Sequence, residues 1–283
     1  MSDFPKFVEF HEEGPREGFQ IEKTIYPIEE RIELINLLSE TGLKNIQVGS
    51  FVSPKYVPQM MDTGELFKRI RRRDGVKYTA LWLNEQGFRK TLSAHNVDIK
   101  AQLLFYSSDS FSRKNNNLSA MEMREKQRDW VRLYKEEGLP VERAYVMAAF
   151  GCNFEGNIPK ERVLDDFRFI LDLAEEEKIP VPDLMLADTM GWGNPDSVKR
   201  MIGALRQRPA SACIFTIPAA SGLPIFTRRC PWGWICSTAP SPGSAAAPSP
   251  IMATVAPLAM SAPRMPCSSV MSLASKPEST STS

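Results

Sequence analysis

Glu12-Glu13-Gly14-Pro15-Arg16-Glu17-Gly18-Phe19-Gln20 is the segment around which the rest of this chain is organised. It follows an apolar run, residues 7–10, that is typical of a first strand. Arg16 and Glu17 therefore stand at the C-terminal end of that strand, where catalytic residues gather in parallel α/β sheets and barrels. A carboxylate there can hold a divalent metal, and an arginine can offset the charge of an oxyanion. The alternative interpretation is a Gly/Pro turn with two exposed charges.

Strand and helix patterns alternate along the first three quarters of the chain. Strands are expected at residues 7–10, 45–48, 77–83, 99–106, 143–149 and 184–187, and helices at 27–41, 59–72, 85–94, 119–137, 160–177 and 195–206. Such alternation predicts a parallel sheet. A chain of 283 residues has room for one barrel or two smaller domains. Six βα units without a Rossmann glycine fingerprint favour a TIM (β/α)8 barrel that needs two more units.

The overall composition excludes several classes of protein. Lys and Arg total 35 against 34 Asp and Glu, so no charge imbalance indicates binding to nucleic acid or to an anionic membrane. No apolar run approaches the ~20 residues of a membrane span. The polar start lacks a signal-peptide pattern, and the five cysteines show no zinc-like pairing. We expect a protein of the reducing cytoplasm.

The composition changes abruptly after Arg208. Glu278 is the one acidic residue beyond it, whereas prolines and four of the five cysteines gather there. We therefore divide the chain into an incomplete barrel domain, residues 1–208, and a low-charge tail rich in Pro, Ser and Ala, residues 209–283, which we expect to be disordered. Such a composition cannot supply two βα units, so we predict no ordered seventh and eighth strands.

Four motifs in the barrel domain give a more specific indication. In order they are Gly14-Pro15-Arg16-Glu17-Gly18-Phe19-Gln20, Ser50-Phe51-Val52-Ser53-Pro54-Lys55-Tyr56-Val57-Pro58-Gln59-Met60, Gly151-Cys152-Asn153-Phe154-Glu155-Gly156 and Asp188-Thr189-Met190-Gly191. Together they resemble the hydroxymethylglutaryl-CoA lyase family, metal-dependent TIM barrels that cleave a 3-hydroxyacyl-CoA by a retro-aldol step. The resemblance covers residues 5–207.

The resemblance implies catalytic and metal-binding roles for three residues. Arg16 would stabilise the enolate oxygen that forms when the carbon–carbon bond breaks. Asp188 stands where the family has a carboxylate near the substrate hydroxyl. Glu17 replaces the family's usual metal-ligating aspartate, and its longer side chain would shift the cation. The implied cofactor is Mg²⁺ or Mn²⁺, which prefer oxygen ligands.

The resemblance also implies three substrate-binding residues. Ser50 matches a position near the free carboxylate of the substrate. Gln20 closes the first motif. Gln47 departs from the family, which often has glutamate there, so a substrate with a different acyl group is one explanation of the difference.

The family's remaining site residues are absent from the present reading frame. The family completes its metal site with a His-x-His pair on the seventh strand and an asparagine on the eighth, and a glycine-rich loop carries a catalytic cysteine. This chain has only His11 and His95, which we assign structural or solvent-exposed roles. Cys152 lies in a matched motif, and we expect it to pack near the barrel mouth.

The residues of the tail permit codons for the missing residues when the tail is read one base out of frame. Residues 213–221 permit His-Leu-His-Asp-Thr-Arg-Gly-Leu, residues 244–250 permit Gly-Gly-Cys-Pro-Phe-Ala, and residues 255–260 permit Gly-Ala-Ala-Gly-Asn. Two of the three bases in each shifted codon are nearly fixed by the residues themselves. We infer that the frame changes between Gln207 and Cys213, through a sequencing error or a real mutation.

The sequence thus predicts a carbon–carbon lyase lineage. Its expected reaction is cleavage of a 3-hydroxyacyl-CoA to acetyl-CoA and a keto acid such as acetoacetate, as in leucine catabolism, with this chain inactive as written. Two alternatives stay open: an aldol-type acyl-CoA synthase of the same superfamily, and a non-catalytic truncated barrel. The expected partner is the acyl-CoA substrate, without nucleic acid or membrane, and a homo-oligomer is left open.

Overall fold

The computed structural model describes residues 7–206, 234–238 and 265–266. Six strands form the parallel framework: β1 (Phe7–Glu12), β2 (Asn45–Ser50), β3 (Lys77–Leu81), β4 (Ala101–Tyr106), β5 (Val141–Met147) and β8 (Asp183–Leu186). Their ends differ from the sequence-based expectation by at most two residues. The short strands β6 (Gly151–Cys152) and β7 (Gly156–Asn157) pair as a hairpin in the loop after β5.

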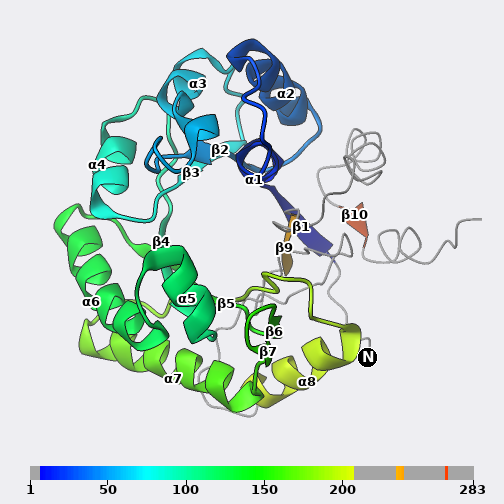
Figure 1. Ribbon diagram of the computed structural model, residues 1–283. Coiled ribbons are helices and arrows are strands. Elements are labelled where there is room, and N and C mark those ends of the chain that lie inside the picture. Colours follow the sequence, from blue (N-terminus) through cyan, green and yellow to red (C-terminus); the bar gives the residue numbers. More distant parts are fainter. Residues whose placement is uncertain (1–6, 207–233, 239–264, 267–283) are drawn as a thin grey trace, which may run out of the picture.

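Helices follow each of these strands. They are α1 (Gly14–Gln20), α2 (Ile28–Glu40), the 3-10 turn η1 (Pro58–Met60), α3 (Thr63–Arg69), α4 (Glu85–Ser93), α5 (Asp109–Asn116), α6 (Ala120–Glu136), α7 (Lys160–Glu176) and α8 (Pro195–Arg206). In Figure 1, α2, α3, α4, α6, α7 and α8 form an outer ring around the strands. This arrangement confirms the predicted α/β fold with parallel strands.

The strands pair in two parallel groups. β1, β2 and β3 form one, with His11 opposite Asn45, and β4, β5 and β8 form the other, with Arg143 opposite Asp183. The backbone N–H of Asp98 donates to the carbonyl of Tyr78 at 2.8 Å, which attaches the segment before β4 to β3. The C-terminal ends of neighbouring strands therefore lie at one edge, where their following loops can meet.

The segment after Arg208 contributes two short strands. β9 (Trp234–Thr238) pairs in parallel with β1, from Val8 opposite Trp234 to Glu12 opposite Thr238, and β10 (Met265–Pro266) pairs antiparallel with the start of β1. The expectation that this segment adds no ordered strand is therefore wrong at β9, because backbone pairing needs no particular side chains. The rest of the predicted tail lies outside the described residues.

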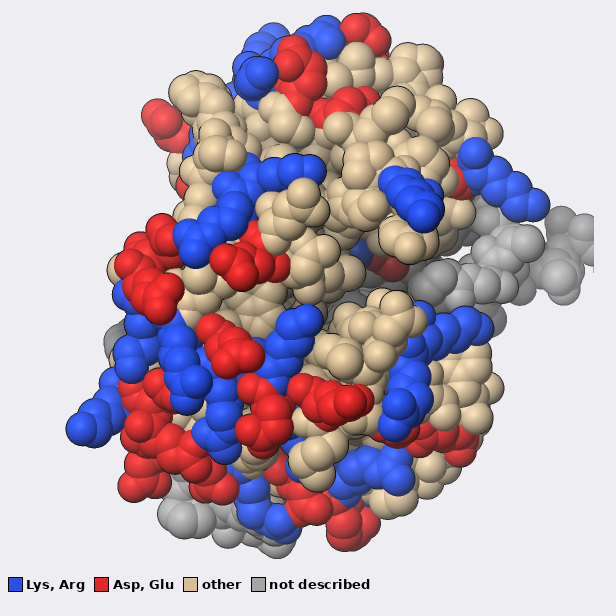
Figure 2. Space-filling view, turned by 60° about the vertical axis from the view of Figure 1, so that its left-hand side comes forward, with Lys and Arg blue, Asp and Glu red and all other residues tan. Residues whose placement is uncertain are grey.

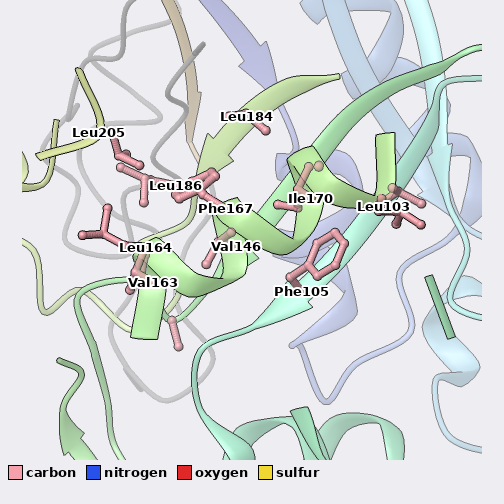
Figure 3. Packing of buried hydrophobic residues seen from close by; sticks show 14 of the residues in the cluster. Leu103, Phe105, Val146, Val163, Leu164, Phe167, Ile170, Leu184, Leu186 and Leu205 are labelled. Atoms are coloured by element: carbon pink, nitrogen blue, oxygen red, sulfur yellow. The ribbon is translucent and has the colours of Figure 1, made fainter. Parts of the chain in front are cut away.

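The larger hydrophobic core lies between the β4–β5–β8 sheet and the helices that cover it. On α7, Val163, Phe167 and Ile170 recur at helical spacing and are at most 2% exposed. Figure 3 shows these side chains packing toward Val146 of β5 and Leu186 of β8. A second core cluster packs β2 and β3 against α2 and α3. The apolar side chains that recur at helical spacing therefore attach the helices to the sheet by packing against it.

The outer faces of α6 and α7 carry both signs of charge. Arg128 pairs with Glu176, and Arg132 pairs with Glu177 at 3.3 Å, so ion pairs bridge the two helices. Figure 2 shows such blue and red side chains interleaved over one face of the molecule. Exposed pairs of this kind contribute little to stability individually. None of the helices in the described part of the chain has the length and apolar character to cross a membrane.

Candidate active site

The first motif forms a helix at the C-terminal end of β1. Pro15 occupies the first turn of α1, where its missing N–H costs no hydrogen bond. The side chains of Arg16 and Glu17 are only 11% and 16% exposed. The alternative of a Gly/Pro turn with two exposed charges is therefore wrong, because the helix turns both side chains inward against neighbouring residues.

Arg16 is held by three side chains. Its Nε donates to Oε1 of Gln47 at 2.5 Å, one terminal nitrogen donates to Oε2 of Glu13 at 2.9 Å, and the other pairs with Glu17. Gln47 can reach Arg16 because the parallel register places the end of β2 beside the end of β1. The structure thus brings together three of the predicted site residues, Arg16, Glu17 and Gln47, and adds Glu13.

Burial dominates the electrostatics around α1. Desolvation lowers the pKa of Arg16, and the nearby Glu13 carboxylate opposes that change. Desolvation also raises the pKa of Glu12 to about 7, although the backbone N–H of Gly14 donates to its Oε1 at 2.6 Å. A carboxyl group that titrates near neutrality thus lies next to the arginine site.

Ser50 and Gln20 form a second contact at the same end of the strands. Ser50 is fully buried, and its Oγ donates to Oε1 of Gln20 at 3.3 Å. Thr63 donates to the carbonyl of Ser50 at 3.1 Å and thereby ties α3 to β2. A Cβ on Gly49 would lie 2.7 Å from Oγ1 of Thr63, so this approach requires glycine.

Asp188 follows β8 and is held by its own loop. Its two carboxylate oxygens accept the backbone N–H groups of Trp192 and Gly193, each at 2.9 Å. Burial raises the pKa of Asp188, and these N–H donors partly counteract the rise. Among the described residues, no hydrogen bond joins Asp188 to Arg16, so the two predicted catalytic residues belong to separate networks.

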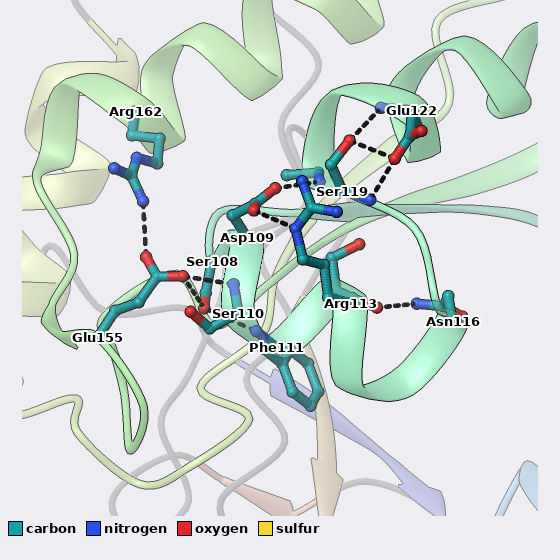
Figure 4. Close-up of polar contacts among 12 residues, drawn as sticks. Ser108, Asp109, Ser110, Phe111, Arg113, Asn116, Ser119, Glu122, Glu155 and Arg162 are labelled. Atoms are coloured by element: carbon teal, nitrogen blue, oxygen red, sulfur yellow. Dashed lines mark hydrogen bonds and ion pairs between the residues drawn. The ribbon is translucent and has the colours of Figure 1, made fainter.

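The matched motif after β5 is fixed by a network of its own (Figure 4). Glu155 accepts from the hydroxyl of Ser108 at 2.9 Å, from the backbone of Ser110 at 2.6 Å and from Arg162 at 2.9 Å. Cys152 is fully buried, and Ser108 Oγ lies 3.0 Å from its Sγ. This confirms the packing role predicted for Cys152.

A polar network fills the barrel interior below the site. Arg143 of β5 donates to Nδ1 of His11 on β1 at 3.1 Å, and Nε2 of His11 donates to Glu9 at 2.9 Å. Lys100 donates to Asn45 at 2.5 Å. Burial, followed by the charge of Arg143, lowers the pKa of His11 to about 3. His11 is therefore a neutral structural residue, as expected, and His95 is exposed to solvent, as expected.

The described residues do not fit a divalent cation. Glu17, the one predicted ligand, is paired with Arg16. Within residues 7–206, no group of three His, Cys, Asp or Glu side chains is arranged to hold a metal. The chain has two histidines in all, and His11 is engaged by Glu9 and Arg143. No metal step can therefore be derived from this chain.

Sequence reasoning missed Glu13, Glu12 and Arg143. Glu13 lies three residues before Arg16 on one turn of a helix, a spacing that brings side chains together. That signal was present, but it applies only once residues 14–20 are known to be helical. Arg143 carries no local signal, because it meets His11 across 132 residues of sequence.

The comparisons with known proteins agree with the resemblance. The HMGL-like family model matches residues 7–217. Human cytoplasmic 3-hydroxy-3-methylglutaryl-CoA lyase is 38% identical over 213 residues, which are 75% of this chain and 55% of that protein. Chicken mitochondrial hydroxymethylglutaryl-CoA lyase is 35% identical over 210 residues, or 74% of this chain and 67% of that protein. The chain thus spans between about half and two thirds of these relatives.

Solved structures give the same result. Hydroxymethylglutaryl-CoA lyase from Pseudomonas aeruginosa matches 77% of this chain and 69% of its own, with a TM-score of 0.66 and 31% identity. The Bacillus subtilis HMG-CoA lyase matches 78% and 71%, with a TM-score of 0.68 and 31% identity. These matches confirm the predicted TIM-barrel fold. The chain therefore belongs to the hydroxymethylglutaryl-CoA lyase (HMGL-like) family.

Proposed function

We propose that α1 and the ends of β2 and β8 form the substrate-facing half of a carbon–carbon lyase site. The substrate would be a 3-hydroxyacyl-CoA such as 3-hydroxy-3-methylglutaryl-CoA, and the products acetyl-CoA and a keto acid such as acetoacetate. The observation that carries the proposal is Arg16 at the C-terminal end of β1, whose side chain is only 11% exposed and donates to Gln47. A related HMG-CoA lyase from Acinetobacter, 30% identical, is described in complex with coenzyme A and 3-methylmalate.

The chemistry assigns one task to each residue. Asp188 accepts the proton of the substrate hydroxyl, and its burial makes the carboxylate a stronger base than an exposed aspartate. When the carbon–carbon bond breaks, its electron pair moves onto the thioester carbonyl. Arg16 then stabilises the resulting enolate oxygen by charge-assisted hydrogen bonds. Ser50 and Gln20 would bind the free carboxylate at the other end of the acyl group.

We propose that this chain does not complete the reaction in its present reading frame. The family's cysteine loop and its His-x-His pair have no counterpart in the present frame, and no group of three His, Cys, Asp or Glu side chains among the described residues is arranged to hold a cation. The second reading frame permits both, as the Gly-Gly-Cys-Pro-Phe-Ala loop and the His-Leu-His strand. There they would hold the Mg²⁺ or Mn²⁺ expected for the family. Glu17 would be the one ligand supplied by the present frame.

A paired assay tests this proposal. The chain is expressed as written and, separately, with one base altered between codons 207 and 213 so that the second frame is read. Acetoacetate release from 3-hydroxy-3-methylglutaryl-CoA is followed with Mg²⁺ or Mn²⁺ and after chelation. We expect cation-dependent cleavage from the restored chain only, and its loss on Arg16→Gln.

Two outcomes would overturn the proposal in different ways. A folded restored chain that condenses acetyl-CoA with a 2-oxo acid, and does not cleave, would be the aldol-type synthase. Acyl-CoA binding by both chains without any cleavage would indicate the non-catalytic barrel. We place the protein in the cytoplasm as part of the same proposal, since relatives are named as cytoplasmic, although others are named as mitochondrial.

A further inference from the structure

Arg16 is already paired with carboxylate side chains of this protein. Each of its three guanidinium nitrogens donates to a side chain of this protein, and two of the three acceptors are the carboxylates of Glu13 and Glu17. Arg16, Glu13 and Glu17 are 11%, 17% and 16% exposed. One buried positive charge is therefore shared by two negative charges in a site that water screens weakly.

Glu13 is the carboxylate that faces the barrel interior. It lines the small cavity between β1, β2 and β5, together with Gln47 and Tyr145. In the described part of the chain, Glu17 is not among the residues that line this cavity. The Glu13 carboxylate is also the partner that opposes the lowering of the Arg16 pKa most strongly. Glu13 thus occupies the cavity side of the guanidinium.

The position of Glu13 is set by the helix. Glu13 is the N-terminal cap of α1, and its carbonyl accepts the backbone N–H groups of Arg16 at 3.0 Å and Glu17 at 2.7 Å. Its backbone is therefore fixed, whereas its side chain can rotate about its own bonds. The carboxylate can leave Arg16 without any change in the fold.

We propose that Glu13 is a specificity-determining residue that competes with an acyl-CoA ligand for Arg16. The inference rests on the proposed function, because it assumes that the ligand brings its thioester carbonyl oxygen to this guanidinium. Every acyl-CoA ligand must displace the Glu13 carboxylate from Arg16, and a ligand whose acyl group is charged must also tolerate the repulsion of that carboxylate. A ligand with a neutral acyl group meets less repulsion. Glu13 therefore lowers affinity for charged acyl groups selectively.

The test compares the affinities of two ligands for three proteins. The ligands are 3-hydroxy-3-methylglutaryl-CoA, whose acyl group carries a carboxylate, and acetyl-CoA, whose acyl group is neutral. The proteins are the full chain, Glu13→Gln and Glu22→Gln, titrated by calorimetry at low salt. Glu22 is an exposed residue just after α1 and controls for the loss of one negative charge.

We expect Glu13→Gln to bind 3-hydroxy-3-methylglutaryl-CoA about tenfold more tightly, because a like charge is removed from a poorly screened site. Its affinity for acetyl-CoA should rise by a smaller factor, because acetyl-CoA lacks the acyl carboxylate that Glu13 repels, and Glu22→Gln should resemble the original chain. An equal change for both ligands, or none, overturns the inference while leaving the proposed function intact. Failure of every protein to bind either ligand overturns both.

A second variant covers the case in which Glu13→Gln does not fold. Glu13→Asp keeps the charge but withdraws it from Arg16 by one methylene group. It should shift the ratio of the two affinities in the same direction by a smaller factor. A folded Glu13→Asp with the original ratio contradicts the inference.

Discussion

Glu12→Gln should change how the stability of this protein depends on pH. Burial raises the pKa of Glu12 from 4.5 to about 7, so the folded protein keeps a proton there that the unfolded chain has released. The folded-state pKa is the higher one, so the contribution of Glu12 to the free energy of unfolding falls as pH rises from 4.5 to about 7. At about 1.4 kcal/mol per pH unit, the fall amounts to about 3 kcal/mol.

His11 opposes this effect over most of the same range. Burial and Arg143 lower its pKa from 6.5 to about 3, so the unfolded chain binds the proton more readily. The contribution of His11 to the free energy of unfolding is therefore fully present above pH 6.5 and is lost as pH falls toward 3. Between pH 4.5 and 6.5 the two slopes have opposite signs and similar size, and they largely cancel in the unaltered protein.

Urea unfolding from pH 4.5 to 7.5, followed by circular dichroism, measures the free energy of unfolding of Glu12→Gln and of the unaltered chain at each pH. Relative to the unaltered chain, Glu12→Gln should gain about 3 kcal/mol in the free energy of unfolding between pH 4.5 and 7. The comparison removes the contributions that the two proteins share, including Glu9 and Lys100 near His11. Parallel stability curves for the two proteins would refute the conclusion that Glu12 keeps its proton in the folded protein near neutral pH.

Three further substitutions test the packing, the Asp188 loop and a helix cap. Phe167→Ala should lower the free energy of unfolding by about 3–5 kcal/mol, because the ring is 2% exposed in the core; a loss below 1 kcal/mol in urea unfolding would contradict that packing. Gly193→Ala places a Cβ 2.8 Å from Oδ2 of Asp188 and should lower the melting temperature, whereas Gly203→Ala in α8, with nothing within 4 Å, should not; equal melting temperatures would exclude the close approach. Ser119→Ala removes the capping box of α6 and should cost about 1 kcal/mol, and an unchanged urea midpoint would count against the cap.

Regular elements were predictable because their signals are local. The alternation of apolar strands with amphipathic helices placed six strands to within two residues. The helix expected from residue 119 begins at Ala120 with Ser119 as its N-cap, and the structure adds a capping box with Glu122 that the sequence analysis did not use. Helix α5 was missed because its sequence, Asp-Ser-Phe-Ser-Arg-Lys-Asn-Asn, is too polar to show an apolar stripe.

The sequence predicted which residues lie at the candidate site, but not which side chains they contact. Arg16 and Ser50 follow strands and match a known motif, so their location could be inferred. The pairing of Arg16 with Glu13 depends on helix α1, which was not predicted because its sequence contains glycine and proline, two residues of low helix propensity. The contact between His11 and Arg143 depends on how β1 and β5 face each other inside the barrel. Such contacts between distant segments are set by packing, which no local pattern specifies.

The nucleotide sequence over codons 207–283 tests most directly whether a second frame of this gene encodes the rest of the lyase. We predict TGC for Cys213 and TTC for Phe215, because the shifted codons then begin with C and read His-x-His. We also predict that the shifted frame stays open beyond the cysteine loop. TGT or TTT at these positions, which would give tyrosine, or a stop codon in that frame would contradict the proposal.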